Sequence, residues 1–447
     1  MKSFTRILTG CIVTLLLANL LGSPRRAAAA PPASPPPPGL FSEDETSADN
    51  GPDRPRHPAE RRSRRVRLNP AGLPNRGRNL TPQAQGQPLR FNLFPDVDLL
   101  ADVETGGDAP LGGTYLRGRL AGQPLSEWTL VERDGAITAS IHTGERSYLI
   151  APQDDGAYAV QEIDLAALPP GAEPLLPDLT PGDLSETALP DAATPAGSGA
   201  TIDLLVVYTP QAAQQAAALS GSIHNLISLA VIETNTGFQN SQITARVQLA
   251  GAAATGYAEA GFGWENTLMQ LAGQGDGVLD EVHDLRDRYG ADAVVLLVGA
   301  GDACGISFLM REPARFASSA FSIVATGCAT GYYSFGHELG HLLGATHDRK
   351  NSGGAGMYPY SYGYQDPSGA FRTVMAYAAG CPGACPRINY WSNPDLTFGG
   401  HPTGTYYLAG DAADNRLTLN QTGAIVAAFR TAMADYNHRV YLPLLVR

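Results

Sequence analysis

Twelve consecutive residues in the last third of the chain determine how the rest is interpreted: His337-Glu338-Leu339-Gly340-His341-Leu342-Leu343-Gly344-Ala345-Thr346-His347-Asp348. Histidines four apart lie on one face of a helix, so His337 and His341 can bind one metal ion together. Glu338 is one step round the helix, where it can reach a metal-bound water. Gly344 favours a left-handed helix end, after which the chain can turn back and bring in His347. Three imidazoles with one open position are typical of catalytic zinc, because structural sites have four protein ligands.

The complete run resembles the long zinc-binding motif of the metzincin metallopeptidases. A bare His-Glu-x-x-His also arises by chance in helices, but Gly344, His347 and Asp348 at fixed spacing make chance a poor explanation. Within the metzincins, an Asp directly after the third histidine is similar to the reprolysin branch. The resemblance implies that Gly344 and Asp348 shape the site without binding the metal.

A second motif, Thr373-Val374-Met375-Ala376-Tyr377, places its methionine 28 residues after the third histidine. A methionine is more often core filling than a functional residue. Here its position resembles the Met-turn of metzincins, which implies that Met375 supports the imidazoles from below. Tyr377 matches a tyrosine that astacins and serralysins carry beside their zinc and that animal reprolysins generally lack. The chain thus combines Asp348 of one branch with Tyr377 of another. This combination, together with the run at Cys385–Pro394, resembles secreted bacterial reprolysin-like peptidases such as the peptidyl-Asp metalloendopeptidases.

The composition indicates an exported protein of more than one domain. The chain has 447 residues, and its charge is uneven: residues 1–90 carry 14 Lys and Arg against 6 Asp and Glu, the remainder 17 against 37. The basic front is Pro-rich with few aromatic residues, so we expect a solvated tail and no nucleic-acid binding. Residues 1–30 are typical of a secretory signal peptide, because the apolar run is too short to span a membrane and small residues follow it. We expect a secreted monomer that does not associate with membranes after signal removal.

Four of the five cysteines lie in the part of the chain that contains the zinc motif: Cys304, Cys328, Cys381 and Cys385. In an exported protein they suggest two disulfides with three connectivities. We favour Cys304–Cys328 and Cys381–Cys385, because the second pair closes a loop through Pro382-Gly383, a sequence that favours a tight turn. A second zinc site is the alternative, but the spacing fits it poorly.

The front half divides into four segments by composition. After the signal, residues 31–85 are Pro-rich and Arg-rich without a hydrophobic period, so we predict disorder. Residues 86–168 contain short alternating runs that predict a small antiparallel β-rich domain. Its position resembles the propeptide of reprolysins, and a β-domain of unrelated role is the alternative. Residues 169–198 are rich in Pro, Gly and Ala and read as a linker.

Residues 199–435 are predicted to form an α/β catalytic domain. Apolar strands at 202–209, 243–250 and 293–298 alternate with helical segments, which implies a mostly parallel twisted sheet covered by helices. The resemblance adds the zinc helix, the Met-turn and an edge strand just before the zinc helix, at 319–324, with which peptide substrates would pair. Residues 418–433 form an amphipathic closing helix. Residues 436–447 are an apolar tail without an assigned role.

The predicted function is a secreted zinc endopeptidase made as a precursor that acts on proteins or peptides. One Zn²⁺ on the three histidines would polarise a water, Glu338 would act as general base, and Tyr377 would stabilise the oxyanion. A calcium site is conceivable but no motif supports it. The alternatives are a zinc-holding adhesin or binding protein, which would usually lose the Glu, and a hydrolase for non-peptide amides or esters. No cysteine lies between Cys11 and Cys304, so latency would require a carboxylate or a covering domain.

Overall fold

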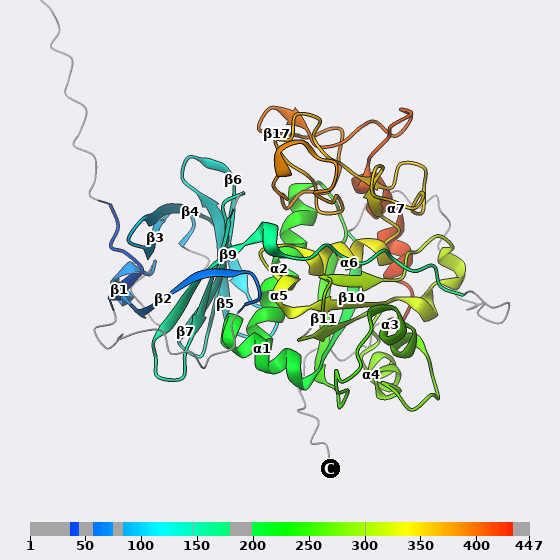
Figure 1. Cartoon of the computed structure of the whole chain (residues 1–447), viewed down its shortest axis with the longest axis horizontal. Coiled ribbons are helices and arrows are strands. Elements are labelled where there is room, and N and C mark those ends of the chain that lie inside the picture. Colours follow the sequence, from blue (N-terminus) through cyan, green and yellow to red (C-terminus); the bar gives the residue numbers. More distant parts are fainter. Residues whose placement is uncertain are drawn as a thin grey trace, which may run out of the picture. The chain divides into compact units, whose positions relative to one another are not determined.

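The computed structural model describes residues 36–43, 57–74, 84–144, 146–178, 199–299 and 301–431 (Figure 1). The predicted signal peptide at 1–30 and tail at 436–447 lie outside the described residues. So does most of the predicted linker, from 179 to 198. The described residues from 37 onward group into one compact unit.

The N-terminal half forms one antiparallel sheet of nine strands in the order β1-β2-β9-β8-β7-β6-β5-β4-β3 (Figure 1). Its core is a cluster of buried aromatic and aliphatic residues that includes Phe91 and Trp128, which pack edge to face. The sheet includes strands within residues 86–168, as the alternating pattern predicts, and it also includes β1 and β2 from the segment before them. The strands are β1 (Phe41–Glu43), β2 (Glu60–Leu68), β3 (Pro88–Phe94), β4 (Val97–Asp108), β5 (Thr114–Leu120), β6 (Gln123–Arg133), β7 (Ala136–His142), β8 (Arg146–Pro152) and β9 (Tyr158–Asp164).

The prediction that residues 31–85 are disordered is wrong for β1 and β2. The Arg-rich run lies in β2, whose Val66 is buried in the sheet core. Its charge is neutralised across the sheet, because acidic residues far along the chain lie beside it. The ion pairs are Arg62 with Asp96 and Glu162, Arg64 with Glu43, and Arg65 with Asp155.

The C-terminal half is built on a five-stranded sheet in the order β11-β10-β12-β14-β13. The first four strands are parallel and β13 is antiparallel to β14, as expected for a mostly parallel α/β domain. The strands are β10 (Thr201–Tyr208), β11 (Arg246–Ala254), β12 (Ala293–Val298), β13 (Gly305–Ser307) and β14 (Phe321–Ala325). Two short pairs complete the strands: β15 (Thr346–Asp348) with β16 (Tyr362–Gly363), and β17 (Thr397–Phe398) with β18 (His401–Pro402).

The strand predicted to lie at the edge of this sheet is not the edge. The segment 319–324 overlaps β14, which has β12 on one side and β13 on the other. The edge strand is β13, which has only three residues. A strand this short is too short for its hydrophobic pattern to be recognised in the sequence. A peptide that pairs with this sheet would therefore lie along β13.

Seven α-helices surround the sheets in the described residues. They are α1 (Pro210–Ser220), α2 (Ile223–Asn240), α3 (Trp264–Ala272), α4 (Glu281–Tyr289), α5 (Thr326–Ala329), α6 (Ser334–Leu342) and α7 (Asn415–Val426). The closing helix predicted at 418–433 thus ends earlier, although Phe429 beyond it is still buried. Among the described residues no single helix has both the length and the apolar character to cross a membrane, while α1 and α2, bent by 76°, meet these criteria as a pair.

Both favoured disulfides are confirmed. Cys304 and Cys328 are joined, which ties the start of β13 to α5. Cys381 and Cys385 are joined across the predicted tight turn, where Gly383 has a φ of 65°. The second pair therefore fixes the loop that leads into the run 385–394.

Candidate active site

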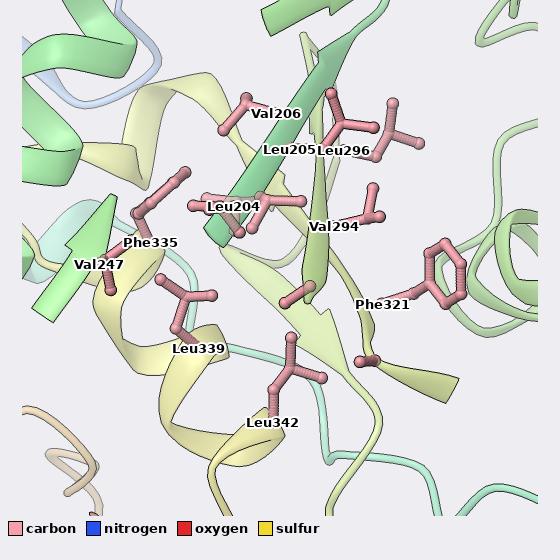
Figure 2. Packing of buried hydrophobic residues seen from close by; sticks show 14 of the residues in the cluster. Leu204, Leu205, Val206, Val247, Val294, Leu296, Phe321, Phe335, Leu339 and Leu342 are labelled. Atoms are coloured by element: carbon pink, nitrogen blue, oxygen red, sulfur yellow. The ribbon is translucent and has the colours of Figure 1, made fainter. Parts of the chain in front are cut away.

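Helix α6 presents its histidines because its other face is fixed on the sheet. Phe335, Leu339 and Leu342, spaced four and three apart, belong to one buried cluster with residues of β10, β11, β12 and β14 (Figure 2). A helix turns by about 100° per residue, so His337 and His341 lie on the side opposite that apolar stripe. The hydrophobic pattern of the helix thus determines where the two imidazoles point.

The chain turns back after α6 as the sequence predicted. Gly344 has a φ of 86°, a left-handed conformation that favours glycine. Beyond it, β15 pairs with β16 and carries His347 into contact with the helix. The third histidine is therefore supplied by a strand rather than by the helix that holds the first two.

The three imidazoles converge through their Nε2 atoms. The Nε2 of His347 lies 3.2 Å from that of His337 and 3.1 Å from that of His341. The Nδ1 atoms of His337 and His341 each lie 2.9 Å from a backbone carbonyl, of Val374 and Ala345 respectively. A carbonyl only accepts, so both Nδ1 atoms carry the proton and both Nε2 lone pairs face inward.

Such a cluster of lone pairs fits a divalent cation. Burial, and next the neighbouring histidines, hold the pKa of His337 and of His341 well below the ordinary value. The rings are therefore neutral, which is the form that binds metal. Three imidazoles without a fourth protein ligand match an open zinc site. Among the described residues, His337, His341 and His347 form the one group of His, Cys, Asp or Glu side chains close enough together to hold a metal ion.

Glu338 lies beside this cluster without joining it. Its side chain is fully buried, and neither carboxylate oxygen has a hydrogen-bond partner among the described residues. Burial raises the pKa of this carboxyl well above its usual value. Gly305 of β13 passes so close that a Cβ there would lie 2.5 Å from the Glu338 Oε1. A buried carboxyl without a hydrogen-bond partner is costly, so Glu338 is a candidate for proton transfer at this site.

The second motif lies beneath and beside the histidines. Met375 is buried, and its Sδ would be 2.7 Å from a Cβ added to Gly340, so that glycine permits the close packing. Asp348 accepts a hydrogen bond of 3.0 Å from the backbone N–H of Tyr377. The ring centroids of Tyr377 and His347 are 4.0 Å apart. The site residues predicted from sequence are thus brought together.

An extended segment within the predicted linker lies against Tyr377 and His347. We call residues 170–175 the strap. It runs parallel to β13 and continues that edge through four backbone hydrogen bonds: Cys304 N to Pro170 O, Ala172 N to Gly305 O, Leu175 N to Ser307 O, and Leu309 N to Leu175 O. The strap therefore occupies the place where a peptide would pair with the sheet.

Within the strap, two residues contact the predicted catalytic groups. The hydroxyl of Tyr377 donates to the carbonyl of Gly171 at 3.0 Å, and a Cβ on Gly171 would lie 3.5 Å from the Glu338 Oε1. The carboxylate of Glu173 lies 3.4 Å from the Nδ1 of His347. That nitrogen faces away from the converging Nε2 atoms, so Glu173 touches the outer side of the ring. The backbone at Gly171, rather than a carboxylate, therefore lies against Tyr377 and Glu338.

The run at 385–394 is bound to the N-terminal sheet. Glu127 of β6 accepts a hydrogen bond of 2.8 Å from the Nδ2 of Asn389, and His142 of β7 is 2.9 Å from the carbonyl of Arg387. Neither contact could be read from the sequence, since both join residues more than 240 positions apart. The strap and β13 were missed for the same reason.

Comparison with known proteins gives matches over the same region. Residues 198–392 match the Reprolysin_5 model of metallo-peptidase family M12. A peptidyl-Asp metalloendopeptidase of Xanthomonas campestris pv. campestris is 36% identical over 340 residues, which cover 74% of this chain and 78% of the relative. One from Stenotrophomonas maltophilia (strain K279a) is 36% identical over 313 residues, covering 69% and 71%. One from Pseudomonas fragi is 32% identical over 199 residues, covering 44% of this chain and 100% of the relative.

Proposed function

Since the chain belongs to the reprolysin-like metallopeptidases of family M12 and is a metalloendopeptidase, we propose that it uses one zinc ion, is secreted, and is made as a latent precursor. The observation that carries the proposal is the buried, unpartnered carboxylate of Glu338 beside three converging imidazoles, with an extended strap across both. The relatives are named for peptidyl-Asp bonds, and we extend that preference to this chain.

The chemistry assigns one role to each group. A zinc ion held by His337, His341 and His347 would polarise a water and the scissile carbonyl. Glu338 would take the proton from the attacking water and return it to the leaving amine. Tyr377 would donate its hydroxyl to the carbonyl oxygen as negative charge develops there, and the carbonyl of Gly171 accepts that same hydrogen bond in this structure. An adhesin on this scaffold would have no need of the unpartnered Glu338.

Replacing Tyr377 with Phe should lower kcat by roughly 10- to 100-fold, with little change in KM. The hydroxyl contributes a single hydrogen-bond donor to an oxygen that becomes charged only in the transition state. Its removal should therefore lower kcat somewhat less than the removal of a full oxyanion-hole donor does. The measurement is steady-state hydrolysis of a quenched peptide by the proteolytically trimmed enzyme. Tyr362→Phe, a change at a buried tyrosine of β16, is the matched control. A Tyr377→Phe enzyme as fast as its parent would make this tyrosine structural.

The precursor should be inactive until the chain is cut within the predicted linker, between residues 179 and 198. The strap then remains attached to the N-terminal sheet alone, and both are held to the catalytic half only by non-covalent contacts. Activity should therefore appear after the cut and increase on dilution, as the released part dissociates. Digestion of casein before and after limited proteolysis measures this, with a chelator that should abolish the activity and added zinc that should restore it.

Thiol-modifying mercurials should leave the precursor inactive. The described cysteines are paired in two disulfides, and the sequence has no cysteine between Cys11 and Cys304. A precursor as active as the trimmed enzyme would show that the strap does not inhibit. Activation by a mercurial would contradict blocking by backbone contacts, and activity that survives the chelator would contradict the proposed zinc chemistry.

A further inference from the structure

Two buried arginines flank the Met-turn, one on either side. Arg372 is 5% exposed and Arg387 4% exposed, and we call them the arginine pair. Both contact Tyr332: the Arg387 Cζ lies 4.4 Å from the ring centroid, and the Arg372 Nη2 donates to the hydroxyl at 3.4 Å. The two positive charges thus share one aromatic neighbour just before the zinc helix.

Among the described residues no salt bridge joins the arginine pair to an acid, although Asp348 acts electrostatically on Arg372 and Glu338 on Arg387. Arg387 donates to the carbonyls of Tyr332 and Ala376, and Arg372 donates to that of Cys385. The Nε of each arginine is buried without any hydrogen-bond partner. A guanidinium has five N–H donors and keeps its charge, so the pair retains free donors in a buried place.

The electrostatics of neighbouring groups agree with an excess of positive charge. Burial, and next the charge of Arg387, lower the pKa of Arg372 to about 10. Burial raises the pKa of the Tyr332 hydroxyl, but the two arginines outweigh it and the net pKa is lowered. Asp348 also acts on Arg372 electrostatically, but its carboxylate is bonded to Asn351 and to the Tyr377 N–H. A buried site with this charge is suited to an anion.

The arginine pair lies next to the place where a peptide pairs with β13. The Arg387 Nη2 is 3.4 Å from the carbonyl of Ala376, which directly precedes Tyr377. Leu168, two residues before the strap, packs in one cluster with Tyr332 and Cys304. A substrate along β13 in place of the strap would therefore bring a side chain close to Tyr332 and the pair.

Another buried arginine shows the contrast. Arg286 is 1% exposed, but its Nε donates to the carbonyl of Ala291 and its Nη2 to that of Asp292, whose carboxylate is a close electrostatic neighbour. The difference lies in the Nε atoms, because that of Arg286 has a hydrogen-bond partner and those of the arginine pair have none among the described residues.

We propose that Arg372 and Arg387 form the subsite that binds the carboxylate of an acidic substrate side chain next to the scissile bond. The proposal rests on the proposed peptidase function and identifies the residues that determine its specificity. Two guanidiniums can hold a carboxylate through parallel N–H bonds, and displacement of the strap and Leu168 would open the way to them. The carboxylate at the end of a peptide has the same chemistry, so the test must separate the two sources.

The test uses the full-length precursor after limited proteolysis and four quenched peptides that differ at one position, which carries Asp, Glu, Asn or Ala. The parent should prefer Asp over Asn by on the order of 100-fold in kcat/KM, because Asn cannot pair with the buried charges. Arg387→Gln and Arg372→Gln should each reduce this ratio at least tenfold, because the Asp peptide loses a charged partner and the Asn peptide has no charge to lose. Arg387→Lys, which keeps the charge but loses the planar fork, should lie between.

Arg286→Gln is the matched control, since it removes an equally buried guanidinium and should lower the thermal midpoint without changing the ratio. If one Gln variant does not fold, the other and Arg387→Lys still decide the result. Asn peptides with free and amidated C-termini separate the two carboxylate sources: equal cleavage supports a side-chain site, and a preference for the free acid overturns it.

Two further results would overturn the assignment. A parent enzyme that cleaves the four peptides equally has no acidic subsite, although the peptidase function would stand. An unchanged Asp-to-Asn ratio in both Gln variants would assign the preference to other residues. A trimmed enzyme that cleaves no peptide even with added zinc would contradict the proposed function itself.

Discussion

Glu338→Gln should leave zinc bound and lower kcat/KM for a peptide by about 10³-fold. The carboxylate lies beside the three imidazoles and is not part of their cluster, so its loss removes no metal ligand. Gln has the same shape but cannot accept the proton from the attacking water. Because both oxygens lack hydrogen-bond partners in the described structure, the change should disturb few other contacts.

The measurement combines peptide hydrolysis with metal analysis of the same preparation. Glu233→Gln is the matched control, since Glu233 is also a buried carboxyl, in α2, and bonds the backbone N–H of Gly331. That variant should keep nearly all activity, which separates loss of a buried acid from loss of the base. Near-parental turnover by a zinc-loaded Glu338→Gln enzyme would remove Glu338 from the mechanism.

The residues of the site could be predicted because their geometry is mostly local. The spacing of His337 and His341 needs only a helix, and the turn at Gly344 needs only a left-handed residue. Met375 and Tyr377 were recognised by resemblance, and in the structure Tyr377 lies against His347 and Met375 against Gly340 of α6. Local chemistry also favoured the disulfide at Cys381–Cys385, which closes a short loop.

The parts that could not be predicted depend on partners far away in the sequence. The Arg-rich strand β2 lacks a hydrophobic period, and it is held by backbone pairing with β9 and by ion pairs such as that of Arg62 with Glu162, 100 positions away. The edge strand β13 is three residues long and is defined by its pairing with β14. The strap is Pro-rich, and its extended conformation becomes informative only when β13 is known to lie beside it. Composition alone therefore predicted disorder for β2 and a linker for the strap, although both segments pair with strands in the folded chain.

His347→Ala should lose both the metal and the activity. The Nε2 of His347 lies within 3.2 Å of the other two, so its removal leaves two ligands on a helix and an incomplete site. Changes to groups that merely orient a ligand cost roughly 10- to 100-fold in metal affinity, and the loss of a ligand itself should exceed that. Peptide hydrolysis should fall to background even after the precursor is trimmed.

The most direct test of the metal centre is the zinc content of this variant after dialysis against a weak chelator. His283→Ala is the control, because His283 lies on α4 and its Nδ1 is 3.0 Å from the Nε2 of Gln274, away from the cluster. We predict one tightly held zinc per chain in the parent and in the control, and none in His347→Ala. One tightly held zinc per chain in His347→Ala would show that the three histidines do not form the site.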